Sequence, residues 1–140
     1  MSDTDREKLF AFFGKYARVQ AAITGAMGTA SVVVAGPLMD VFGIQRNAAS
    51  DLMFRAFGAG IVFVAVTHYG AKDTRDVAFI KTVATSNLVE DGILAVLSTM
   101  GTLNGTFGKA GWLLAGLFSA EVIAAIYVLS LARKAGTDSP

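Results

Sequence analysis

The chain contains no cysteine and a single histidine, His68, and these absences exclude several kinds of site. Without cysteine there can be no disulfide, thiolate metal site or cysteine nucleophile. One histidine is too few for a metal site built on a histidine cluster. We therefore predict that the protein holds no metal ion.

Charged residues are also scarce, at 16% of the 140 residues, and the net charge is only +1. The basic residues are scattered and do not form a stripe mixed with aromatic residues, so we expect no nucleic-acid partner. Hydrophobic residues instead make up 54% of the chain, and the mean hydropathy of +0.55 is high for a soluble domain of this size. The composition predicts an integral membrane protein.

Four apolar segments are long enough to cross a hydrocarbon core about 30 Å thick as helices. We place these spans at about residues 19–39, 51–71, 76–100 and 110–132. Their length and their content of Ala, Leu and Gly favour helices over buried strands. The first and fourth segments lack the polar stripe that a soluble bundle requires. The sequence therefore predicts an all-α, integral membrane four-helix bundle, with residues 1–140 forming one transmembrane domain.

A short amphipathic helix at about residues 4–17 is predicted to lie in the membrane interface before the first span. Its apolar residues recur at helical spacing (Leu9, Phe12, Phe13 and Tyr16). We favour the role of an anchor or an extension of the first span over that of a surface for docking a partner. The polar tail after Ala132 is expected to be loose.

The distribution of Lys and Arg predicts the orientation of the chain. With four spans, the two termini and the loop between the second and third spans lie on one side of the membrane. That side carries eight basic residues, and the opposite loops carry two, Arg46 and Lys109. Because basic loops are retained in the cytoplasm, we expect both termini to be cytoplasmic.

Polar and ionisable residues inside the spans are the candidate functional residues. A charge at the centre of a bilayer costs about 2.5 to 3.5 kcal/mol and normally has a partner inside the bundle. Asn87, Glu90 and Asp91 share one face of a helix, and we expect Arg55 on the neighbouring helix to meet one of these acids. The candidates for a polar network or a ligand site are Arg55, His68, Asn87, Glu90, Asp91 and Glu121.

Several roles for these residues are open. A structural network that fixes the helix register is one; a proton or ion path, a pocket for a polar lipid or small ligand, and acid-base catalysis by Glu90 and Glu121 are the others. Catalysis has the least support, because no nucleophile motif, phosphate loop or metal spacing accompanies the acids. We predict no catalytic residue and no cofactor, although a lipid, or a tetrapyrrole held by His68, remains an alternative.

Two short stretches resemble a pattern found in a broad set of small four-helix integral membrane proteins, largely of unknown function. In that set a helix begins with Arg-x-Phe/Tyr-Gly and a later helix carries Asp-Gly; here "DLMFRAFGAG" opens the second span and "EDGI" lies in the third. The four-span plan with a polar third helix is also similar to the small scaffold protein of ergosterol synthesis. The resemblance implies membrane topology and a contact between Arg55 and an acid.

We therefore predict a non-catalytic, small multi-pass accessory or scaffold subunit, surrounded by membrane lipids and packed against other membrane proteins or against itself. Small residues at four-residue spacing in the first span, Ala22, Ala26 and Ala30, predict where helices meet closely. The alternative function is a membrane-embedded ligand-handling protein, either a lipid-pocket enzyme or a proton-coupled carrier, that uses the intramembrane carboxylates.

Overall fold

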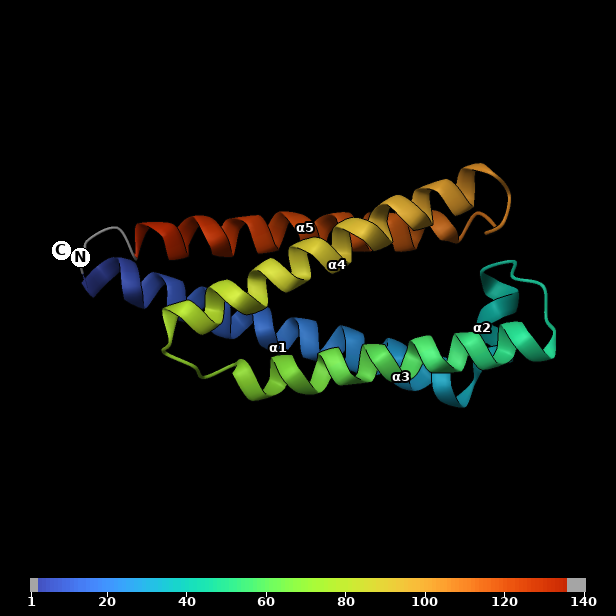
Figure 1. Ribbon diagram of the computed structural model, residues 1–140, viewed down its shortest axis with the longest axis horizontal. Coiled ribbons are helices and arrows are strands. Elements are labelled where there is room, and N and C mark those ends of the chain that lie inside the picture. The colour runs from blue at the N-terminus through green and yellow to red at the C-terminus, as the bar shows by residue number, and fades with distance from the viewer. Residues whose placement is uncertain (1–2, 136–140) are drawn as a thin grey trace.

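The computed structural model describes residues 3–135, which form five helices and no strand (Figure 1). The protein is therefore all-helical, as the sequence predicts. The helices are α1 (Asp3–Val33), α2 (Ala35–Val41), α3 (Ala48–Ala71), α4 (Val77–Leu103) and α5 (Gly111–Lys134). Beyond α5, the last residues of the predicted loose tail, 136–140, lie outside the described residues.

The four long helices run side by side along the longest axis of the molecule (Figure 1). Helix α1 packs mainly against α3, α4 packs mainly against α5, and α1 also contacts α5. The start of α1, the loop at residues 72–76 and the end of α5 lie at one end of the molecule, and α2 and the loop between α4 and α5 lie at the other. The chain thus consists of two helix pairs, α1 with α3 and α4 with α5.

Two of the described helices, α3 and α5, are each long and apolar enough to cross a membrane. They correspond to the predicted spans at 51–71 and 110–132. Helices α1 and α2 meet the same criterion only when they are taken together as one bent span. Helix α4, which carries Lys81, Glu90 and Asp91, does not meet it. Large apolar side chains project outward from the membrane-length helices, including Phe63 at 73% exposed and Leu113 at 74%.

Local hydrogen bonds at their first residues explain where α3 and α4 begin. Asn47 and Ser50 form a capping box, in which each side chain accepts a hydrogen bond from the backbone N–H of the other residue. The Asp76 carboxylate accepts hydrogen bonds from the backbone N–H groups of Ala78 and Phe79. These caps satisfy amides that have no partner inside the helix.

The first predicted span, 19–39, is not one straight helix. The chain breaks at Val34, and the axes of α1 and α2 are bent by 109°. Pro37 has no backbone N–H to bond to the carbonyl of Val33, and its ring would clash with that carbonyl in a continuous helix. The proline therefore accounts for the end of α1 at Val33.

The predicted interfacial helix at 4–17 is also not a separate element, because α1 is continuous from Asp3 to Val33. Leu9 and Phe13 are fully buried, and they belong to a core that includes Ile80 of α4 and Val128 of α5. The apolar face that the sequence assigns to the membrane interface therefore faces the interior of the protein. No proline, glycine pair or capping residue separates residue 17 from residue 19, so nothing interrupts the helix there.

Glycines bring α1 and α3 into backbone contact. A Cβ atom on Gly28 would lie 2.7 Å from the Gly58 carbonyl oxygen, and one on Gly58 would lie 2.6 Å from the Ser31 Cβ. Both positions therefore require glycine. Of the small residues in the first span, Gly28 thus lies in a close helix contact, whereas Ala22 and Ala26 of the predicted alanine row are exposed.

Ion pairs hold the loop at residues 72–76 against α1. Arg18 of α1 pairs with Asp73 at 2.7 Å, and Arg75 of the loop pairs with Glu7 of α1, also at 2.7 Å. This end of the molecule, where α1 begins and α5 ends, is consequently rich in charge.

Candidate functional site

Five buried polar side chains gather where all four long helices come together. We call them the polar cluster: Tyr16 of α1, His68 of α3, Asn87 and Asp91 of α4, and Glu121 of α5. Each is more than nine-tenths buried, from His68 at 1% exposed to Tyr16 at 8%. Four of the six residues predicted from the sequence, His68, Asn87, Asp91 and Glu121, are thus brought together.

Asn87 connects three helices through its side-chain amide. Its Nδ2 donates to the Tyr16 hydroxyl oxygen and lies 2.6 Å from His68 Nε2. His68 Nδ1 lies 2.9 Å from the Val64 carbonyl oxygen, which can only accept, so Nδ1 carries the hydrogen and Nε2 accepts from Asn87. The two amide hydrogens of Asn87 are therefore both used, and His68 is neutral in this arrangement.

Asp91 and Glu121 form a carboxyl pair across the interface between α4 and α5. Their side chains interact across this interface. Asp91 Oδ2 and Glu121 Oε1 are fully buried, and neither has a hydrogen-bond partner among the described residues. Because buried polar atoms are normally paired, these two oxygens are the least satisfied atoms of the polar cluster.

Arg55 does not join the polar cluster. It pairs with Asp51 one turn earlier on α3, with Nε 2.8 Å from the carboxylate, and it donates to the Val32 carbonyl oxygen of α1. The expected pairing of Arg55 with Glu90 or Asp91 is replaced because α3 packs on α1 and lies apart from α4 at this end of the molecule (Figure 1).

Tyr16 is the member of the polar cluster that the sequence prediction missed. It was assigned to the apolar face of an interfacial helix, but its hydroxyl lies inside the bundle. Gln20 and Thr24, also buried, follow it at four-residue intervals on α1. A repeat of polar residues every four positions, running into an apolar span, was the signal for a polar face on this helix.

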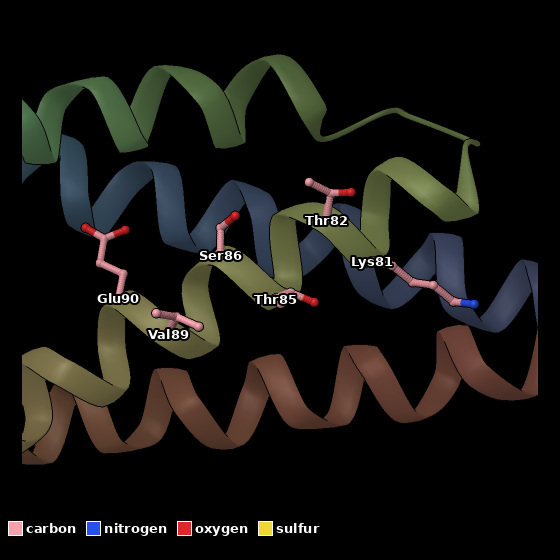
Figure 2. A pocket seen from close by; sticks show the side chains of 6 residues that line it. All are labelled: Lys81, Thr82, Thr85, Ser86, Val89 and Glu90. Carbon is pink, nitrogen blue, oxygen red and sulfur yellow. The ribbon is translucent and has the colours of Figure 1, made fainter.

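Glu90 lies next to the polar cluster but opens onto a different surface. It is partly exposed and lines an open groove of about 580 Å³ along α4, which we call the α4 groove. Figure 2 shows Thr82, Ser86 and Glu90 in successive turns along one side of α4. The remaining lining residues are Lys81, Thr85 and Val89. Val77–Leu103 places 13 residues of the helix on each side of Glu90, so the carboxyl group is at the midpoint of α4.

An apolar cavity of about 430 Å³ lies between α3 and the pair of α4 and α5, towards the end of the molecule that carries α2. We call it the apolar pocket. Five phenylalanines line it: Phe42, Phe54, Phe57, Phe107 and Phe118. Leu94 and Phe118, also in the lining, are each one helical turn from a member of the carboxyl pair.

The fold and site define an all-helical protein with two membrane-length helices and a polar cluster in its core. No protein-family model, curated protein or solved structure matches the chain. Among residues 3–135, no group of three or more Asp, Glu or His side chains is arranged to hold a metal ion. The chemistry available at the site is therefore that of carboxyl, amide, hydroxyl and imidazole groups.

Proposed function

We propose that the protein is a small multi-pass membrane accessory subunit that binds another membrane protein through the α4 groove. In this proposal α1, α3, α4 and α5 form a four-helix bundle in the bilayer, with both termini in the cytoplasm. Three observations support the topology: the membrane-length helices α3 and α5, the position of the start of α1 and the end of α5 at one end of the molecule, and the excess of basic residues at that end.

The observation that carries the proposal is the partly exposed carboxyl group of Glu90 at the midpoint of α4. In a bilayer this position is near the hydrocarbon centre, where an acidic side chain costs about 2.5 to 3.5 kcal/mol. Exposed Thr82, Thr85 and Ser86 continue the polar surface toward Lys81. A partner helix that supplies hydrogen-bond donors at the depth of Glu90 removes this cost, because polar contacts between helices stabilise association in lipid.

The α4 groove favours a different chain over a second copy of this one. A second copy related by an axis along the membrane normal, with its groove at the interface, would place the two Glu90 side chains opposite each other. Two ionised carboxylates at that depth repel and neither supplies a donor, so such a pair would first have to bind a proton. We therefore infer a partner with amide, hydroxyl or basic side chains in one of its spans.

Photo-crosslinking in the native membrane tests this proposal. A photoreactive amino acid is placed at Thr85 in the groove and, as a control, at Ile123, which is 68% exposed on α5. We expect Thr85 to give one discrete heteromeric product and Ile123 to give only lipid adducts. The Thr85 product should be lost when Glu90→Leu is added. A product with the mass of two copies, or equal protein crosslinking at the two positions, would refute the proposed interface.

The apolar pocket supports a second candidate, a ligand-handling protein for a hydrophobic small molecule. Binding sites of this kind are mostly apolar with a few polar groups, and the pocket ends one helical turn from Asp91 and Glu121. Native mass spectrometry of gently extracted protein tests it. A bound molecule that is lost in Leu94→Trp, which fills the pocket, and kept in Leu52→Trp, which changes an exposed residue outside it, would favour this candidate.

A further inference from the structure

The carboxyl pair of Asp91 and Glu121 has a feature that neither helix packing nor the α4 groove explains. The two groups lie on helices that pack against each other, each is more than nine-tenths buried, and each has a buried oxygen without a hydrogen-bond partner among the described residues. Leu94 and Phe118, one helical turn away on α4 and α5, line the same pocket, which places Asp91 and Glu121 opposite each other. An ionised carboxylate can only accept a hydrogen bond, so a hydrogen bond between two carboxyl groups exists only when one of them carries a proton. One proton on the pair would therefore give these buried oxygens the hydrogen-bond partner that they lack.

The groups that face the pair supply no positive charge that would replace the proton. Tyr16 faces it from α1, His68 from α3 and Glu90 from α4. His68 is neutral in its observed hydrogen bonds, and Glu90 adds a further carboxyl group. The ion pairs described between residues 3 and 135 all lie elsewhere in the molecule. Two full negative charges would therefore stand side by side without a cation, which is unfavourable in a low-dielectric interior.

The number of oxygen atoms around Asp91 and Glu121 decides which cation the pair can bind. Neither Asp91 nor Glu121 lines the α4 groove or the apolar pocket. Among the described residues, no third Asp, Glu or His side chain is placed to form a metal site with the pair. A calcium ion takes six to eight oxygen ligands and a magnesium ion takes six. A proton needs only the two facing oxygens.

We propose that Asp91 and Glu121 form a proton-binding site inside the bundle, in which the two carboxyl groups hold one proton at neutral pH. When the site loses that proton, the oxygen atoms across the interface between α4 and α5 become alike in charge and repel. This inference does not depend on the partner proposed for the α4 groove.

Infrared spectroscopy of the full chain in lipid nanodiscs tests the site, because a protonated carboxyl group has a C=O stretch that shifts on deuteration and is separate from the carboxylate bands. At neutral pH we expect the wild type to show this band and Asp91→Asn/Glu121→Gln to lose it. Glu90→Gln is the matched control, since it removes a neighbouring carboxyl group outside the pair, and it should keep the band. Retention of the full band in the double variant would refute the site.

A second measurement on the wild type protects the test against variants that fail to fold. Isotopic labelling of the side-chain carboxyl carbons, in aspartate alone or in glutamate alone, moves the band of a labelled acid without changing the sequence. We expect the band to move with at least one of the two labels and to disappear on titration to alkaline pH. The absence of any protonated carboxyl band in the wild type at neutral pH would overturn the proposal.

Discussion

The two helix pairs are held together in different ways. Between α1 and α3 the backbones touch, because Gly28 and Gly58 leave no room for a Cβ atom. Between α4 and α5 the contact includes large side chains and the carboxyl pair of Asp91 and Glu121. The first pair combines close backbone packing with the hydrogen bond from Arg55 to the Val32 carbonyl oxygen, whereas the second carries unpartnered polar atoms in its interface. The glycine-mediated backbone contact thus lies in the first half of the chain, and the carboxyl pair lies in the second.

The largest effect should come from filling the contact between α1 and α3. Gly58→Leu places a side chain where a Cβ alone would be 2.6 Å from Ser31, so the helices must separate. We expect a loss of about 3 kcal/mol or more in the free energy of unfolding, at the upper end of overpacking effects. Thermal denaturation in detergent micelles measures it. An unchanged unfolding temperature would mean that α1 and α3 do not pack through these glycines.

A smaller loss should follow when the link between the two halves is removed. Asn87→Leu keeps the volume but leaves the Tyr16 hydroxyl and His68 Nε2 without the amide that bonds them. Leaving buried polar atoms unsatisfied costs about 1 to 3 kcal/mol. The same denaturation assay measures the loss, and Thr82→Val on the exposed side of α4 serves as the control. Equal effects of the two substitutions would contradict the role of Asn87.

Gly60→Ala should have a small effect of opposite sign. A Cβ atom on Gly60 would have no neighbour within 4 Å, although this residue belongs to the same helix as Gly58. Alanine is a better helix former than glycine by up to about 1 kcal/mol. We expect an unfolding temperature equal to or slightly above that of the wild type. A loss comparable to that of Gly58→Leu would show that the second face of α3 is also in contact with protein.

The smallest change in stability is expected for Glu121→Gln. The glutamine amide can donate to Asp91 in place of the proposed shared proton. The fold should therefore survive with an unfolding temperature close to that of the wild type, while the infrared band of the protonated acid is lost. A large loss of stability would instead show that the pair has a structural role.

The first and last residues of the apolar helices could be predicted from the sequence, but the helices that each one packs against could not. The predicted spans at 51–71 and 110–132 agree with α3 and α5 to within three residues at each end. Capping residues and long uncharged runs are local signals, and they are legible in a single sequence. The bend at Val34 also has a local signal, Pro37. The prediction of one continuous span relied on the length of the uncharged run between residues 18 and 40 and did not use the proline.

The membership of the polar cluster depended on which helices pack together. Arg55 was expected to find its acid on another helix, but the local partner Asp51, at i,i+4 spacing, satisfies it. Tyr16 was assigned outward because it continues the apolar row of Leu9, Phe12 and Phe13 at helical spacing. The packing of α1 against the other helices turns that face inward. The repeat of Tyr16, Gln20 and Thr24 marks a polar face on α1, but it does not show which helices that face meets.

The bend at Val34 determines whether a molecule reaches the apolar pocket from the lipid or from the water. After the bend, α2 leads to Phe42 and Ile44 in the pocket wall, and the Phe42 carbonyl oxygen accepts a hydrogen bond of 2.6 Å from the Gly108 N–H of the loop between α4 and α5. In the proposed bilayer these segments separate the pocket from the water at that end. A molecule that enters between α3 and α4 must first dissolve in the membrane. Its occupancy should therefore follow its lipid-water partition coefficient more closely than its concentration in water.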